Sequence, residues 1–422
     1  MIPAVIERCA GIDVGRKFIE VCVMIGEAQG VPTEQKRSFS TLNEDLENLR
    51  HWLHNNGCTH VAMESTGSYW RPIYNVLDDG QIEVILANSQ HVKNLRGHKT
   101  DRNDARWLAH LLRHGMIRAS YIPDRATREL RDLTRRRKQM VGCAVDERNR
   151  VQRVLQEANV QVGAVLSDLF GESGLKMLEG LMNPDATPEE IADLAVKQAR
   201  KKIPVLRKAL EGHRMTEHHR TLIRHCMEHL AFLEEEIADL DREAAKHIKA
   251  DTALHTATQL AQSVPGIRET AAAAIIAEIG PDMKQFPNAG KLSSWIGTCP
   301  GNNITGGKRK SGQTRKGNPW ARRVLVECAW SASRKRDSET KRFYERMRPR
   351  LKHKPALVAT AHLLTVKLHD VLLTAKPYAE NPQSQLTASQ ANRLVRHHTR
   401  RIRHLGRWLA SHKTRCAEKT ET

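Results

Sequence analysis

Residues 8–26, RCAGIDVGRKFIEVCVMIG, decide the fold that this sequence predicts. Apolar residues alternate there with small or polar ones on both sides of a Gly-Arg turn, and a period of two around such a turn is typical of a β-hairpin. A third strand and then alternating helices and short apolar strands follow over residues 36–40, 42–55, 59–65, 69–79 and 82–88. This order predicts an α/β unit whose sheet begins with antiparallel strands and continues through crossover connections.

The chain changes character at Arg125. A charged, helix-favouring run begins there with apolar residues every three or four positions, and residues 215–248 carry a similar apolar stripe. An antiparallel coiled coil with a helical insertion over residues 165–210 would pair the two stripes. Two helices of an ordinary bundle would pair them equally well.

The pattern changes again near Ser263, in SVPGIRETAAAAIIAEIG. A Pro-Gly turn before an Ala-rich helix is the pattern of a helix-hairpin-helix, whose turn amides can approach a phosphate. A mostly helical C-terminal domain is therefore expected. The domains predicted from these changes are residues 1–123, 124–255 and 256–380, followed by a basic tail at 381–422.

The charge of the chain favours a polyanionic partner. It holds 68 Lys and Arg against 48 Asp and Glu, a formal net charge of +20. Nucleic acid is a more probable partner than a membrane surface. It also explains the excess of positive charge better than solubility alone does. The charged residues Glu7 and Arg8 interrupt the N-terminal apolar stretch that a signal peptide would need. The eight cysteines contain no C-x-x-C motif. We expect a cytoplasmic protein with neither a disulfide framework nor a thiolate zinc site.

Two aspartates begin an amphipathic helix in residues 98–115, HKTDRNDARWLAHLLRHG. Asp101 and Asp104 are three positions apart, so both can point at one spot. They could simply cap the helix and favour its first turn. Asp13 in GIDVG and Glu64 in MESTG lie among small or apolar neighbours, where an uncompensated carboxylate is costly.

These four carboxylates can meet if the first strand lies beside the strand that carries Glu64. The helix of Asp101 and Asp104 would then pack across the ends of both strands. Hard oxygen ligands suit Mg²⁺ or Mn²⁺, and two such ions about 4 Å apart stabilise the attacking and leaving oxygens of a phosphodiester. The sequence therefore predicts a divalent metal site formed by Asp13, Glu64, Asp101 and Asp104.

A second candidate site is the glycine-rich, basic loop that contains NNITGGKRKSGQTRKG. A hydroxyl beside Gly306 and Gly307 can approach a phosphate closely, because glycine adds no side-chain bulk. The cations expected to neutralise the phosphate are Lys308, Arg309, Lys310, Arg315 and Lys316. The alternative is a flexible basic linker that touches phosphates nonspecifically.

Three further cations lie beside the paired aspartates: Lys99, Arg102 and Arg106. They could steer nucleic acid toward the carboxylates. They could equally form salt bridges on a solvated helix face.

In combination, these motifs resemble one family. G-I-D-V, E-S-T-G, K-T-D-x-x-D-A and the late V-P-G-I and G-N-N-x-[S/T]-G-G-K blocks resemble the DEDD insertion-sequence transposases, which are related to the Piv invertases and are bridge-RNA-guided recombinases. The resemblance covers residues 1–120 and 260–330 closely, and the middle of the chain by character only.

The resemblance implies a RuvC-like N-terminal domain with the RNase H fold, a coiled coil and a C-terminal transposase domain. It assigns Mg²⁺ binding to Asp13, Glu64, Asp101 and Asp104. It also implies a hydroxyl nucleophile that forms a covalent protein–DNA intermediate. The matching residue is Thr305, where the family usually has Ser, and Ser311 is the nearby alternative.

The function predicted is that of a transposase that acts on donor and target DNA with a structured guide RNA. The assembly implied is a tetramer built from dimers. Two other functions fit parts of the pattern: a metal-only junction-resolving nuclease, in which Thr305 and its loop merely bind phosphate, and a non-catalytic RNA-binding scaffold.

Overall fold

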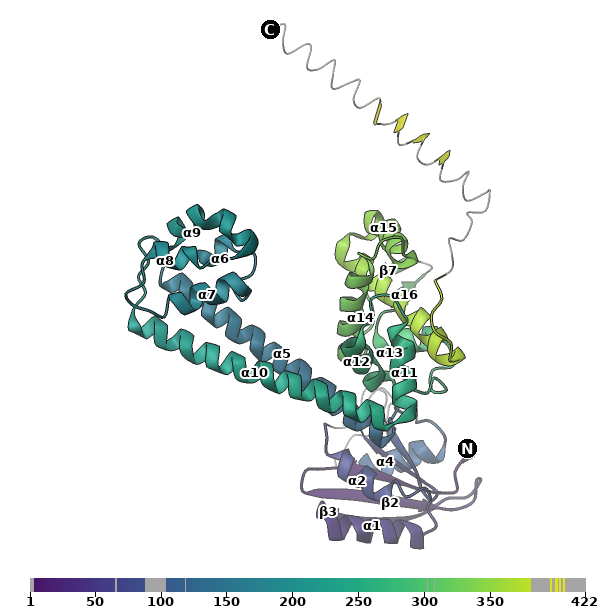
Figure 1. The fold of residues 1–422 in the computed structure, drawn as a ribbon. Helices are drawn as coiled ribbons and strands as arrows, with labels where there is room; N and C mark the ends of the chain where they lie inside the picture. Colours follow the sequence, from purple (N-terminus) through teal and green to yellow (C-terminus); the bar gives the residue numbers. More distant parts are fainter. Residues whose placement is uncertain are drawn as a thin grey trace. The chain divides into compact units, whose positions relative to one another are not determined.

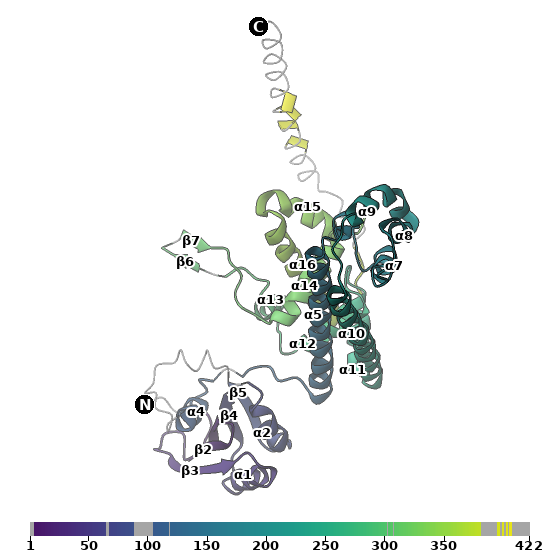
Figure 2. The same ribbon diagram turned by 90° about the vertical axis from the view of Figure 1, so that its left-hand side faces the viewer.

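The structure is a computed structural model of the chain. It describes residues 4–64, 67–87, 104–117, 119–301, 303–306, 308–380, 395–396, 399–400, 402–403 and 405–406. The chain divides into two compact units, Met1–Pro123 and Asp124–Thr422. Figures 1 and 2 show the elements of each unit.

The N-terminal unit contains a mixed five-stranded sheet. Its strands are β1 (Arg8–Val14), β2 (Phe18–Ile25), β3 (Thr33–Ser40), β4 (His60–Glu64) and β5 (Glu83–Ala87). They lie in the order β3-β2-β1-β4-β5. The first three strands are antiparallel to one another, whereas β4 is parallel to both β1 and β5. The sheet thus begins antiparallel and continues through crossovers, as the sequence predicts.

Helices cover both faces of this sheet (Figure 2). On one face, the core that contains Ile12 and Met63 also includes residues of α1 (Asn43–Asn55) and α2 (Trp70–Leu77). On the other face, α4 (Asp104–Arg113) packs on a smaller core. The observed order of elements is the predicted one, and β3 begins three residues earlier than expected.

Two long helices dominate the C-terminal unit, α5 (Arg125–Glu157) and α10 (Glu217–Ala250). They run antiparallel, because Arg137 pairs with Asp241 and Arg148, further along α5, pairs with Glu234. Figure 1 shows a cluster of short helices at one end of the pair, α6 to α9. These are α6 (Val162–Val165), α7 (Glu172–Gly180), α8 (Pro188–Asp193), the 3₁₀ helix Lys197–Lys202 and α9 (Ile203–Leu210). The insertion has an apolar core of its own.

The remaining helices are α11 (Thr252–Gln262), α12 (Glu269–Ile279), α13 (Ala289–Ile296), α14 (Pro319–Ala332), α15 (Glu339–Leu351) and α16 (His353–Thr374). All of them except α15 contribute to a second large core, whereas α15 packs with the start of α16 in a smaller cluster. Among the described helices, α16 alone is long and apolar enough to span a membrane. Within its apolar window 61% is buried inside the protein, and Leu364 and Leu368 are fully buried in the core.

The basic loop after α13 is more ordered than the sequence predicts. It contains a short hairpin of β6 (Asn303–Thr305) and β7 (Lys308–Ser311), in which Thr305 pairs with Lys308. A two-residue Gly-Gly connection favours such a hairpin, because its turn needs positive φ angles. Gly306 has a φ of 56°. The predicted glycine-rich loop therefore contains a hairpin that the sequence analysis did not predict.

The Pro-Gly turn between α11 and α12 packs against α14. Gly266 has a φ of +87°, and a Cβ atom there would lie 2.6 Å from the carbonyl oxygen of Cys328. Close packing thus accounts for this glycine. The helix-hairpin-helix and its phosphate contact stay predictions.

Candidate metal centre and nucleophile hairpin

Adjacent parallel strands carry Asp13 and Glu64. Ile12 on β1 is in register with Met63 on β4, so Asp13 and Glu64 each lie one residue further along. Side chains alternate between the faces of a sheet. Because Ile12 and Met63 belong to the core on the α1 and α2 side, Asp13 and Glu64 lie on the opposite face, which α4 covers.

Helix α4 approaches that face through Gly11. A Cβ atom on Gly11 would collide with the carbonyl oxygen of Ala105 and the amide nitrogen of Ala109. The glycine lets the backbone of α4 rest directly on β1. Asp104, the first described residue of α4, precedes Ala105 and so belongs to the same end of this face as Asp13.

Three of the four predicted carboxylates therefore share one end of one sheet face. Asp13, Glu64 and Asp104 are each half-buried. Asp101 lies outside the described residues. Within the part of the chain that the structure describes, no three His, Cys, Asp or Glu residues are grouped closely enough to hold a metal ion. The donor chemistry of the face fits a hard cation, but the ligand set stays a prediction.

A fifth carboxylate on this face escaped the sequence reasoning. Glu20 on β2 is directly opposite Asp13 in the antiparallel register. Its side chain is exposed. Counting residues outward from the Gly-Arg turn would have identified this pairing, since opposite residues in a hairpin share a face.

Arg106, one of the cations expected beside the aspartates, binds a carboxylate of the same unit. Its Nε and Nη2 donate to the Oε1 atom of Glu34 on β3 over 2.9 and 2.7 Å. This hydrogen bond holds the pKa of Glu34 below its usual value. The arrangement favours the salt-bridge interpretation for Arg106. Lys99 and Arg102 lie outside the described residues.

The β6–β7 hairpin separates the two candidate nucleophiles. Thr305 ends β6 at the tip of the hairpin, whereas Ser311 pairs with Asn303 at its base. A Cβ atom on Gly306 would meet nothing within 4 Å, so the tip is open on that side. Lys308, Arg309 and Lys310 lie on β7. Arg315 and Lys316 follow the hairpin and are exposed.

A buried carboxylate, Glu278 on α12, fixes the end of this basic loop. Glu278 is 2% exposed and accepts two hydrogen bonds from Arg135 of α5, over 2.7 and 2.8 Å. Asn318 also donates to Glu278 over 2.7 Å, while its side-chain oxygen caps α14 at Trp320 and Ala321. The network therefore ties α5, α12 and the start of α14 together.

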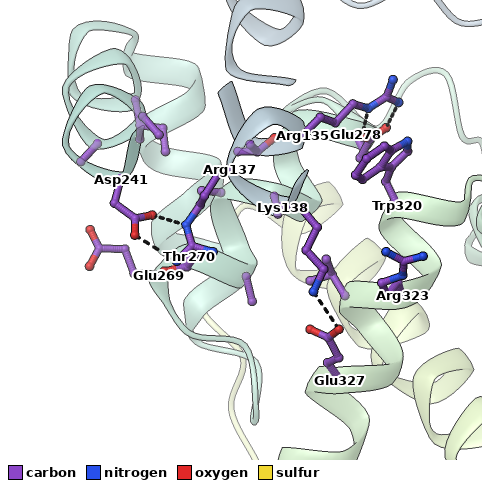
Figure 3. A pocket seen from close by; sticks show the side chains of 18 of the residues that line it. Arg135, Arg137, Lys138, Asp241, Glu269, Thr270, Glu278, Trp320, Arg323 and Glu327 are labelled. Atoms are coloured by element: carbon purple, nitrogen blue, oxygen red, sulfur yellow. Dashed lines mark hydrogen bonds and ion pairs between the residues drawn. The ribbon is translucent and has the colours of Figure 1, made fainter. Parts of the chain in front are cut away.

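Figure 3 shows the ion pair of Arg135 and Glu278 at the edge of a pocket of about 670 Å³ between α5, α10, α12 and α14. The ion pairs Arg137–Asp241 and Lys138–Glu327 lie along the same pocket. Each of these pairs joins residues far apart in the chain. No local sequence signal could have identified them.

Two family models and one curated relative point to the same family of transposases. A family model described as a transposase, of the DEDD type named for IS110, matches residues 10–160, and the model "Transposase IS116/IS110/IS902 family" matches residues 258–345. The "Probable family 20 transposase" of Pseudomonas aeruginosa is 25% identical over 307 residues, which cover 72% of this chain and 80% of that protein. The RuvC structure from Thermus thermophilus is 16% identical and covers 27% of this chain and 84% of that chain, with a TM-score of 0.20.

The first matched region includes all four predicted carboxylates, and the second includes Thr305 and Ser311. Both candidate sites thus fall within matched regions. The chain belongs to the DEDD transposases of the IS110 type, which are DNA-recombining enzymes.

Proposed function

We propose that this transposase exchanges DNA strands by metal-dependent phosphoryl transfer, with Asp13, Glu64, Asp101 and Asp104 as the ligands of Mg²⁺ or Mn²⁺. The observation that carries this proposal is the parallel register of β1 and β4, with α4 on the same face. Bound divalent ions would stabilise the charge that develops on the attacking and leaving oxygens.

In the proposed reaction, the hydroxyl of Thr305 is the nucleophile. Its oxygen bonds to the phosphorus of a DNA phosphodiester and gives up its proton, while the bond from phosphorus to one sugar oxygen breaks. That sugar oxygen takes a proton and leaves as a hydroxyl. A sugar hydroxyl of a second strand then attacks the same phosphorus and releases Thr305, so that one phosphodiester replaces another.

The residues around Thr305 have distinct roles in this proposal. The hairpin turn at Gly306 leaves room for the phosphate. Lys308, Arg309, Lys310, Arg315 and Lys316 would neutralise its oxygens. The extra methyl group of Thr restricts rotation of the hydroxyl, so we expect a slower attack than Ser would give at this position.

Trapping of the covalent intermediate tests this proposal. We expect the parent protein with cognate DNA and Mg²⁺ to give a protein–DNA adduct on a denaturing gel. Thr305→Ala should abolish the adduct, Thr305→Ser should keep it, and Ser311→Ala is the matched control. If Ser311→Ala abolishes the adduct and Thr305→Ala does not, Ser311 is the nucleophile instead of Thr305. Cleaved DNA without any adduct would instead support a metal-only nuclease.

We also propose that a structured guide RNA and further copies of the chain complete the assembly. The net charge of +20 favours nucleic-acid partners, and an RNA bound together with the DNA is compatible with it. Sequencing the RNA that copurifies with the protein tests this directly, and a single enriched, structured species is expected. Unaltered biological activity of Asp13→Asn would instead favour the non-catalytic scaffold.

A further inference from the structure

The segment around α15 is the most basic part of the described C-terminal unit outside the hairpin. Residues 334–354 contain ten Lys and Arg but three Asp and Glu, a net charge of +7. Six arginines of this segment are exposed, and we name them the α15 patch: Arg334, Arg336, Arg342, Arg346, Arg348 and Arg350. No motif in the sequence analysis included them.

Three of these arginines form a stripe on the outer side of α15. Arg342, Arg346 and Arg350 follow one another at four-residue intervals and therefore share a face of the helix, about 6 Å apart along its axis. Thr340 and Tyr344 lie on the inner side and are buried. The stripe consequently faces solvent in this unit.

The protein itself neutralises little of the α15 patch: Lys367 is the main cause that lowers the pKa of Glu339, and the charge of Arg342 adds to it. Among the described residues, none of its six arginines forms an ion pair. The nearby carboxylates have other partners: Glu339 binds Lys367 over 3.0 Å, and Glu345 lies 3.8 Å from Lys341. Lys367 is 9% exposed and also donates to Tyr378, so this contact anchors the start of α15 on α16.

Most arginines of α5 show the opposite behaviour. Six of them each pair with a carboxylate: Arg125, Arg131, Arg135, Arg137, Arg148 and Arg150. The charge of α5 therefore stabilises the fold. By contrast, like charges four residues apart repel one another and destabilise an isolated helix. An external anion would relieve this repulsion in α15.

We propose that the α15 patch binds the sugar–phosphate backbone of DNA, as a contact surface additional to the β6–β7 hairpin. The guanidinium group matches phosphate geometry with two parallel hydrogen bonds, which makes arginine the preferred residue for such contacts. DNA is the occupant because it is the substrate of the family. In that respect the inference rests on the proposed function.

Contacts within the protein hold three arginines of the α15 patch in place. Arg342 donates to the carbonyl oxygen of Asp337 over 3.1 Å, which ties it to the turn before α15. The guanidinium of Arg346 lies 5.4 Å from the ring centre of Phe343, and that of Arg334 lies 4.1 Å from the ring centre of Trp330. Stacked guanidinium groups keep their hydrogen-bond donors available at the edge.

The salt dependence of DNA binding tests the proposal. Each phosphate contact contributes about 0.9 to the slope of log K against log salt, so the triple variant R342Q/R346Q/R350Q should have a slope shallower by about 2.7. Its affinity for duplex DNA near physiological salt should fall by on the order of tenfold. The matched control is R125Q/R207Q/R224Q, which removes the same charge from exposed arginines that have carboxylate partners. This control should keep the slope of the parent.

Three outcomes would overturn the proposal: an unchanged slope in the α15 variant, an equal loss in the control, or a loss confined to RNA or to vesicles of anionic lipid. The thermal melting of both variants shows whether they fold. The covalent adduct, measured at saturating DNA, separates the two proposals. If only the α15 patch is misassigned, the triple variant keeps the salt slope of the parent and still forms the adduct. If the parent itself forms no adduct, the proposed function is contradicted instead.

Discussion

At the scale of single residues, the proposed metal site depends on carboxylates that lie on the same face of the N-terminal sheet. Asp13 and Glu64 could be placed on neighbouring strands from the sequence, because Asp13 lies among the small and apolar residues of an alternating strand and Glu64 ends a short apolar strand. Glu20 was missed because its side chain is exposed and its strand gives it no special surroundings. The ion pair of Arg106 with Glu34 was missed because 72 positions separate the two residues.

Asp101→Asn should abolish DNA cleavage and leave DNA affinity similar or higher. The substitution removes a proposed metal ligand and also removes a negative charge that repels phosphate. Cleavage of a labelled duplex and its binding isotherm measure the two effects separately. Glu20→Gln is the control on the same face and should retain cleavage. Much weaker binding of Asp101→Asn with intact cleavage would contradict the metal role.

The ion pair of Arg106 and Glu34 should make stability depend on pH. The pKa of Glu34 is lowered by its hydrogen bond from Arg106, so the pair stabilises the fold above the unfolded-state pKa of Glu34. The benefit is lost as the pH falls through the lowered pKa of the folded state. Because both groups are partly exposed, Arg106→Gln should cost about 0.5 kcal/mol at neutral pH.

Urea denaturation of the parent and of Arg106→Gln at pH 7, and again at about pH 3, measures this dependence. The difference between the two proteins should shrink at the acidic pH. A difference that is the same at both pH values would show that Arg106 stabilises the fold by packing alone.

At the scale of elements, the periodicity of apolar residues was enough to predict the strands of the sheet and the long helices. The contacts between side chains far apart in the sequence could not be predicted in this way. The apolar stripes of α5 and α10 predicted their pairing. The network of Glu278 could not be predicted, because Arg135 lies 143 positions away and Asn318 lies 40 positions away. The β6–β7 hairpin was missed because its strands are polar and short.

Gly11→Ala should strongly destabilise the N-terminal unit. The added methyl group collides with the backbone of α4, which cannot yield as a flexible side chain would. We expect a loss of about 2 kcal/mol or more in the free energy of unfolding. Gly142→Ala on α5 is the control, because nothing lies within 4 Å of its added atom. In that helix interior alanine should stabilise by roughly 0.5–1 kcal/mol. Equal effects of the two changes in denaturant unfolding would contradict this packing.

Glu278→Gln should destabilise the C-terminal unit by about 3 kcal/mol, because it leaves Arg135 and Arg131 beside a buried group without charge. Glu327→Gln is the matched control. It breaks the exposed pair with Lys138 and should cost less than about 1 kcal/mol. Thermal unfolding of both variants compares them. A loss for Glu278→Gln as small as that of the control would show that Glu278 contributes no more than a surface pair.

At the scale of the whole molecule, the family models match the two regions that carry the candidate sites. The composition predicted a polyanionic partner, but it did not show which of the basic residues are available to contact that partner. The structure shows that arginines of α5 are used within the fold, whereas those of α15 have no carboxylate partner among the described residues. Such a distinction needs three-dimensional contacts, since both helices are equally rich in arginine by sequence.

Binding of Mn²⁺ is the sharpest test of the proposed metal site, because it requires neither DNA nor turnover. Titration followed by the paramagnetic resonance of free Mn²⁺ should show saturable binding to the parent protein. Binding should be lost or greatly weakened in Asp13→Asn and Asp104→Asn, while the melting temperatures without metal stay close to that of the parent. Unchanged Mn²⁺ titrations in both variants would contradict a metal site at the shared end of β1, β4 and α4.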